Sequence, residues 1–266
     1  MSSFYSSVYE LEKSGQNGAI CTIIDTRGST PRHVGSKMLV FADGHITGTV
    51  GGGEVENRTI QEALGAIKDG KNRLLSYDMV DPERGDPGIC GGTLQIFIEP
   101  ILSKPLCLIV GVGHVGRCVT RVAKFLEYRV IVSDDRPEFC GVEASPEADE
   151  IIECKMSELP DKLDLSGSYV ILTTRGTDVD IEGLPNLIDA NPAYIGIIGS
   201  KRRWLNTRNK LIELGFPQEK IDRVHSPIGL ELNAETPEEI AISIMAELIL
   251  IRNGGSGLLM KYTPKK

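Results

Sequence analysis

The sequence predicts an α/β protein with a mixed α+β domain over residues 1–104 and a Rossmann-like, doubly wound parallel sheet over residues 105–266. The main observation is an apolar strand at 106–110 that leads directly into the glycine turn Gly111-Val112-Gly113-His114-Val115-Gly116. A second observation is the alternation of strand and helix patterns after that turn, which is typical of a parallel sheet. A third is the series of hairpin and turn signals before residue 100, which indicates a different architecture there.

The expected N-terminal elements follow from hydrophobic spacing and turn residues. Residues 4–13 carry apolar side chains at helical spacing, and a second helix begins after Gly53 and ends at Gly70. Asp43-Gly44 is typical of a tight hairpin turn. Strands are expected at 19–25, 37–42, 46–50, 74–78 and 93–99, followed by a linker at 100–105.

The expected C-terminal elements alternate more regularly. Strands are expected at 106–110, 129–133, 151–152, 169–173, 194–198 and 224–225, and helices at 114–127, 181–189 and 201–214. A last helix begins at Thr236-Pro237-Glu238-Glu239, which is a capping box with proline at the first helical position.

Acidic residues exceed basic ones and give the chain a formal net charge of −8. Such a protein has no general electrostatic attraction to nucleic acid or to an anionic membrane, so neither is an expected partner. Residues 1–14 lack the apolar segment of a signal peptide, and the apolar stretch 240–251 is short and contains Glu247. We therefore expect a cytoplasmic protein, in which the helix at 237–251 lines either a core or a homodimer interface.

The glycine turn after the first parallel strand predicts a dinucleotide-type ligand. Gly111 is expected to form the tight turn, Gly113 to admit a pyrophosphate and Gly116 to allow close packing of helix and strand. Asp134 lies 23 residues beyond Gly111, close to the spacing of an acid that binds a ribose. His114 stands where nicotinamide enzymes usually have a small residue, so it either contacts a ligand or is simply exposed. A purely structural role of the turn remains the alternative.

Two further glycine-rich segments lie in the N-terminal domain. Gly51-Gly52-Gly53-Glu54 joins a strand to a helix and is expected to expose amides to a phosphate, with the alternative of a flexible turn. Cys90-Gly91-Gly92 leaves a thiol uncrowded, which favours chemistry at Cys90 over burial. Arg27, Arg32 and Lys37 form a basic cluster that is either a local anion site or a solvated loop.

Several long motifs occur in a specific order. They are Gly28-Ser29-Thr30-Pro31-Arg32, Gly48-Thr49-Val50-Gly51-Gly52-Gly53-Glu54, Cys90-Gly91-Gly92, Asp134-Asp135-Arg136-Pro137 and Ile197-Ile198-Gly199-Ser200-Lys201-Arg202-Arg203. Together they resemble the XdhC/CoxI family over essentially the whole chain. The resemblance implies an N-terminal cofactor-maturation domain followed by a Rossmann domain. One departure is Thr177, where the family often has a histidine.

The resemblance also implies a function. Proteins of this family look like maturation factors for molybdenum hydroxylases such as xanthine dehydrogenase, which bind molybdenum cofactor, favour its sulfurated form and deliver it to the apo-enzyme. The expected partners are therefore an apo molybdenum hydroxylase and a cysteine desulfurase. On this interpretation the chain is a cofactor-binding chaperone rather than a turnover enzyme.

The same resemblance indicates which residues hold the cofactor. Its phosphate or pyrophosphate is expected to meet the two glycine loops and a set of polar and basic residues, which comprises Arg32, Arg136, Ser200, Lys201, Arg202 and Arg203. The Cys90 thiolate is expected either to ligate molybdenum or to relay sulfur.

Two other functions stay open. An NAD(P)-dependent oxidoreductase is favoured by the glycine turn and Asp134, although no hydride-transfer domain follows the fold. A scaffold that docks a hydroxylase to a sulfur donor, without binding cofactor itself, is the third interpretation.

Overall fold

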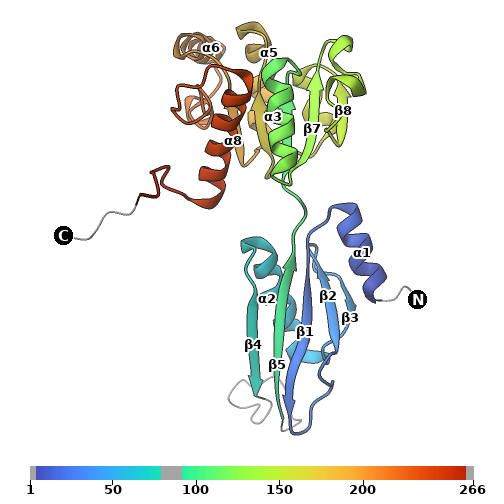
Figure 1. Cartoon of the computed structure of the whole chain (residues 1–266). Helices are drawn as coiled ribbons and strands as arrows, with labels where there is room; N and C mark the ends of the chain where they lie inside the picture. Colours follow the sequence, from blue (N-terminus) through green and yellow to red (C-terminus); the bar gives the residue numbers. More distant parts are fainter. Residues whose placement is uncertain (1–3, 79–91, 262–266) are drawn as a thin grey trace, which may run out of the picture. The chain divides into compact units, whose positions relative to one another are not determined.

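A computed structural model of the chain describes residues 4–78 and 92–261 (Figure 1). Contacts divide the chain into two compact units, Met1–Ser103 and Lys104–Lys266, each described here by itself. Two of the predicted site residues, Cys90 and Gly91, lie outside the described residues.

The first unit is built on a five-stranded antiparallel sheet with the order β3-β2-β1-β5-β4. Its strands are β1 (Gly18–Arg27), β2 (Lys37–Phe41), β3 (Ile46–Gly48), β4 (Arg73–Asp78) and β5 (Thr93–Ile101). Helix α2 (Gly53–Asp69) buries Val55, Ala63 and Ala66 in the core that it shares with β1 and β5. Helix α1 (Phe4–Ser14) contacts β2 and β3 instead.

The linker predicted at 100–105 is wrong at its start, because β5 continues through Pro100 to Ile101. Pro100 lies opposite Ala19 of β1, while the pairing of β5 with β4 ends at Ile98. A proline has no N–H to donate, so it is tolerated where a strand has lost one of its neighbours.

The second unit confirms the predicted Rossmann-like parallel sheet, with the strand order β10-β9-β6-β7-β8. Its strands are β6 (Leu106–Val110), β7 (Arg129–Asp134), β8 (Glu150–Glu153), β9 (Tyr169–Leu172) and β10 (Tyr194–Ile197). The chain proceeds from β6 to one side and then returns to β9 on the other side. In such sheets, ligands bind at this reversal point, outside the carboxyl ends of the strands.

Helices cover both faces of the parallel sheet (Figure 1). They are α3 (His114–Phe125), α5 (Thr177–Asp189), α6 (Lys201–Glu213) and α8 (Pro237–Asn253), with the short α4 (Leu159–Lys162) and α7 (Gln218–Ile221). Cys107 and Ile109 of β6 face the core shared with α3 and α8, whereas Leu108 and Val110 face α5 and α6. None of the helices in the described ranges has the length and apolar content needed to cross a membrane.

Among the C-terminal elements, one helix start and one short strand depart from the predictions, and the short helices α4 and α7 were not predicted. Helix α5 begins at Thr177, four residues before the predicted start at 181, because Gly176 is extended and acidic side chains occupy the first turn. The predicted strand at 224–225 is a single bridge between His225 and Gly196. The predicted capping box of α8 is confirmed, since Thr236 and Glu239 cap each other's backbone amides.

Candidate functional site

The three glycines of the turn after β6 have different structural constraints. At Gly111, which has φ of +102°, an added Cβ would lie 2.5 Å from the carbonyl oxygen of Thr173. At Gly116 a Cβ would collide with the carbonyl oxygen of Gly111. At Gly113 a Cβ would meet no described atom within 4 Å. The outer glycines are thus required by packing, whereas the middle glycine leaves open space.

The first turn of α3 lies beside this open space. Gly113 is the N-cap residue and supplies no side-chain cap, and no acidic residue occupies the first turn. The free amides and the helix dipole therefore present partial positive charge at the turn. The exposed His114 side chain makes no hydrogen bond or ion pair within residues 4–78 and 92–261.

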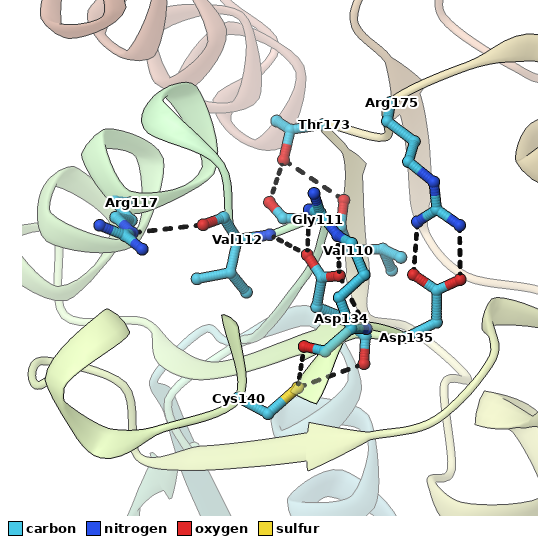
Figure 2. A network of polar contacts seen from close by, with 10 residues as sticks. Val110, Gly111, Val112, Arg117, Asp134, Asp135, Cys140, Thr173 and Arg175 are labelled. Atoms are coloured by element: carbon cyan, nitrogen blue, oxygen red, sulfur yellow. Dashed lines mark hydrogen bonds and ion pairs between the residues drawn. The ribbon is translucent and has the colours of Figure 1, made fainter. Parts of the chain in front are cut away.

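Asp134, the predicted ribose acid at the end of β7, is only 3% exposed and is held by protein donors (Figure 2). Its Oδ2 accepts a hydrogen bond from the Val112 amide at 2.8 Å and one from Arg136 Nη2 at 2.9 Å. Its Oδ1 accepts from the Arg136 amide at 3.1 Å and from Arg136 Nε at 2.8 Å. Both oxygens have two donors each, so this conformation leaves no lone pair for a ribose hydroxyl.

These contacts also set the charge of Asp134. Burial raises the pKa of the carboxyl group, but the Arg136 side chain and the amides of Val112 and Arg136 outweigh burial and hold the pKa below its ordinary value. Asp134 is therefore a fixed anion that joins the glycine turn to Arg136.

Two arginines flank one aromatic ring next to the turn. The Arg136 guanidinium lies 3.8 Å from the ring centroid of Phe139, and that of Arg117 lies 5.7 Å from it. Arg117 Nε donates to the carbonyl oxygen of Val112 at 3.2 Å, as Figure 2 shows. Arg117 was missed by the sequence analysis, although a cation directly after the third glycine was a signal for it.

A second ion pair joins the ends of β7 and β9. Arg175 donates from Nη1 to Asp135 Oδ1 at 2.5 Å and from Nη2 to Asp135 Oδ2 at 2.7 Å (Figure 2). This pair, with Gly111, Asp134 and Arg136, lines a hollow of about 20 Å³ at the carboxyl ends of the strands. The hollow at this edge of the sheet is therefore small, and two ion pairs line it.

The basic run at the start of α6 contains one partly buried and two exposed side chains. Arg203 turns inward and donates from Nη2 to Asp180 Oδ2 and to Thr174 Oγ1, both at 2.6 Å. The Ser200 hydroxyl caps α6 by accepting from the Arg203 amide at 3.2 Å. Lys201 and Arg202 are exposed. Arg203 therefore joins α6 to α5 and to the segment after β9, and of these three cations only its two neighbours present their charges outward.

The N-terminal glycine loop contains an internal anion that the sequence analysis missed. Glu56 Oε2 accepts hydrogen bonds from the amides of Val50 and Gly52, both at 3.3 Å, and from Thr49 Oγ1 at 2.5 Å. Gly51, Gly52 and Gly53 all have positive φ, as the loop requires. Glu54 is exposed and pairs with Arg58 at 2.9 Å. The protein's own carboxylate thus occupies the amide of Gly52, which was expected to face a phosphate, and the amide of Val50 before it.

Gly92 and Gly51 of the first unit lie against the loop that follows β1. A Cβ on Gly92 would lie 2.6 Å from the carbonyl oxygen of Arg27, and one on Gly51 would lie 2.8 Å from Pro31 Cγ. Both glycines therefore pack against the loop that carries the exposed Arg32.

The described cysteines fit packing better than chemistry. Burial raises the pKa of Cys107 to about 12, and Cys118 is also buried, so both behave as small buried hydrophobes. The Cys140 thiol donates to the carbonyl oxygens of Asp134 and Arg136 at 3.3 Å. Within the described residues, no cluster of three or more His, Cys, Asp or Glu side chains is arranged to hold a metal ion.

Comparison with known proteins places this geometry in a family. Residues 107–248 match the XdhC Rossmann domain, and residues 11–78 match the XdhC and CoxI family. The uncharacterized protein YqeB of Escherichia coli K12 is 35% identical over 259 residues, which are 96% of this chain and 47% of YqeB. The chain thus spans about half the length of that relative.

Two further proteins resemble the chain over most of both lengths. The molybdenum cofactor insertion chaperone PaoD of E. coli K12 is 24% identical over 274 residues, covering 91% of this chain and 86% of PaoD. The crystal structure of a xanthine dehydrogenase from Bacillus halodurans has a TM-score of 0.52 and 24% identity, covering 95% of this chain and 96% of that one, and shows the shared fold. Because the XdhC Rossmann domain match alone covers more than half of the chain, this protein belongs to the XdhC and CoxI family.

Proposed function

We propose that this chain binds molybdenum cofactor and assists its sulfuration and insertion into a xanthine dehydrogenase-type hydroxylase. The observation that carries the proposal is the similarity to the insertion chaperone PaoD over 91% of this chain and 86% of PaoD. On this proposal the protein is a cofactor-binding chaperone and not a turnover enzyme.

The second unit supports the proposal through its fit to a phosphate group. Molybdopterin carries a phosphate or a dinucleotide pyrophosphate, and the open space at Gly113 lies beside the free amides of α3. Arg117 is tied directly to Val112 of the same turn and Arg136 is tied to it through Asp134, and both keep N–H groups that have no acceptor among the described residues. When bound, the cofactor would supply the molybdenum and sulfur chemistry, while these residues hold its phosphate.

Cys90 is the proposed sulfur-handling residue. Its assignment rests on the sequence Cys90-Gly91-Gly92, since Cys90 lies outside the described residues. A thiolate is a soft ligand for molybdenum and also a carrier of persulfide sulfur.

The proposed setting includes partners and a compartment. An apo molybdenum hydroxylase would receive the cofactor, a cysteine desulfurase would supply sulfur, and the exchange would take place in the cytoplasm. A homodimer through α8 is part of the proposal, because Ile242 and Ile251 of this helix are exposed.

The test is to purify the protein from a molybdenum-replete host and to measure bound pterin, bound molybdenum and activation of an apo-hydroxylase. We expect co-purified pterin and molybdenum, and activation that depends on the protein. Cys90→Ala should lower activation, whereas Cys118→Ala, which removes a buried thiol of α3, should not. A pterin-free protein that activates nothing would overturn the proposal, and normal retention and activation by Cys90→Ala would remove the role of the thiol.

An NAD(P)-dependent oxidoreductase is the second candidate, favoured by the strand order and the glycine turn. It predicts saturable nicotinamide binding and turnover of a small substrate. A docking scaffold, by contrast, predicts capture of a hydroxylase and a sulfur donor by cofactor-free protein.

A further inference from the structure

We infer that Arg117 and Arg136 form an arginine pair that binds a phosphate group of the ligand, and that Asp134 positions Arg136 instead of accepting a ribose hydroxyl. The inference rests on the proposed function only in taking the turn after β6 as the ligand site. The ligand class that follows is a phosphate ester or pyrophosphate, recognised by its phosphate and not by a ribose diol.

Both arginines are attached to one residue of the turn. The Val112 carbonyl oxygen accepts from Arg117 Nε at 3.2 Å, and the Val112 amide donates to Asp134 Oδ2 at 2.8 Å. Asp134 in turn binds Arg136 through Nε and Nη2. The positions of both guanidinium groups are therefore coupled to the backbone of the glycine turn.

The ring of Phe139 lies close to both cations. Both guanidinium groups lie within cation–π range of this ring, at 3.8 and 5.7 Å from its centroid. Stacking restricts the plane of a guanidinium group, so less conformational entropy is lost when it binds a phosphate.

The charges and donors of the pair are only partly satisfied by the protein. Arg136 has Asp134 as its salt-bridge partner, whereas Arg117 has no carboxylate partner within the described ranges. Nη1 of Arg136 and both terminal nitrogens of Arg117 make no hydrogen bond to a described residue. Because guanidinium N–H groups form strong, charge-assisted hydrogen bonds with phosphate oxygens, these free donors match a phosphate group.

Asp134 is arranged to hold Arg136 and not a sugar. A ribose hydroxyl could bind its carboxylate only by displacing one of the four donors already present, at a site that is almost fully buried. A nucleotide and a pterin phosphate both offer the phosphate that the arginine pair requires, so the experiment compares a nucleotide with inorganic pyrophosphate to show whether more than the phosphate is recognised.

The experiment is isothermal titration of the full chain with ADP, 2′-deoxy-ADP, adenosine and inorganic pyrophosphate at low salt. ADP should bind saturably, 2′-deoxy-ADP within about twofold of ADP, and adenosine at least tenfold more weakly. Pyrophosphate binding comparable to that of ADP indicates recognition of the phosphate alone, and clearly weaker binding indicates a nucleotide; both results support the inference. A tenfold loss with 2′-deoxy-ADP, or no saturable ADP binding, overturns it.

Substitutions test whether ADP binding depends on these two arginines or on positive charge in general. Arg117→Gln and Arg136→Gln should each weaken ADP binding about tenfold. Arg121→Gln is the matched control, because Arg121 lies one turn further along α3 and pairs with Glu147, so its loss should leave binding unchanged. If Arg117→Gln and Arg121→Gln behave alike, the arginine pair is not the site.

The change in ADP affinity caused by Asp134→Asn shows whether Asp134 acts by positioning Arg136 or only through its negative charge. Removing a negative charge beside an anion site should strengthen ADP binding if Asp134 acts only through its field. If Asp134 holds Arg136 in place, its loss should instead weaken ADP binding severalfold, with the thermal unfolding midpoint as the check on folding.

The inference and the proposed function can fail separately. Phosphate-dependent ADP binding in a protein that carries no pterin and activates no hydroxylase would uphold this inference and reject the proposed function. A protein that carries pterin and activates a hydroxylase, but shows no phosphate-dependent ADP binding, would uphold the proposed function and reject this inference.

Discussion

The glycine loop before α2 and the glycine turn before α3 differ in how the protein satisfies their amides. In the first, the carboxylate of Glu56 accepts from the amides of Val50 and Gly52, so the chain supplies its own anion. In the second, the Asp134 carboxylate accepts from one amide of the turn, that of Val112, and space remains open at Gly113. A glycine-rich strand-to-helix loop is thus an anion site only where no acid of the same chain has filled it.

The largest expected effect tests the packing of the second turn. Gly116→Ala should lower the free energy of unfolding by about 3 kcal/mol, because its Cβ would collide with the Gly111 carbonyl oxygen. Gly113→Ala should cost less than about 1 kcal/mol, since its Cβ meets no described atom. Urea unfolding measures both. Equal losses from the two variants would contradict the distinction between packing glycines and an open one.

The next effect concerns the internal anion of the first loop. Glu56→Ala should cost about 2 kcal/mol, because two amides and the Thr49 hydroxyl lose their acceptor. The emptied loop should then gain stability from added sulfate, whereas the wild-type loop should not. Thermal unfolding with and without sulfate, at matched ionic strength, is the measurement. A sulfate response as large in the wild type would mean that Glu56 does not fill the loop.

A smaller effect is the pH dependence of the stability that Asp134 contributes at the glycine turn before α3. The pKa of Asp134 is lowered in the folded state, so its contribution is fully present above the unfolded pKa, about 3.9, and is lost as pH falls through the folded pKa. Asp134→Asn should therefore lower stability by about 1 to 2 kcal/mol at pH 7, with the difference from wild type narrowing below about pH 4. Urea unfolding from pH 7 to pH 3 gives this curve. A constant difference would show that the carboxylate charge is not involved.

Much of the fold was predictable because its signals are local. The apolar strand 106–110, the spacing of Gly111, Gly113 and Gly116 and the capping box at Thr236 each determine nearby backbone structure. The partners of charged groups were harder to predict, since they depend on side-chain direction. Glu56 folds back onto a loop that precedes it by several residues, and no periodicity in the sequence indicates this.

The inward position of Arg203 did have a readable signal in the sequence. Arg203 was grouped with Lys201 and Arg202 as an anion partner, yet it shares a helix stripe with Thr207 and Leu211, both buried. Spacing of four residues places these three side chains on one face of α6, whereas the other two cations fall outside it. The helical period thus separates a partly buried arginine from its exposed neighbours, whereas a run of basic residues in the sequence does not.

The smallest expected effect concerns how acidic side chains interact with the helix dipole at the starts of α2 and α3. Helix α2 has Glu54 and Glu56 in its first turn, whereas α3 has no acid there. His114→Glu should therefore stabilise α3 by about 0.5 kcal/mol, and Glu54→Gln should destabilise α2 by a similar amount. The more informative result is functional, because an acid at position 114 places a negative charge where the ligand phosphate is proposed to bind. His114→Glu should raise the thermal unfolding midpoint slightly and weaken ADP binding, with His114→Gln as the neutral control. A variant that is stabilised and still binds ADP as tightly as wild type would mean that the α3 start holds no phosphate.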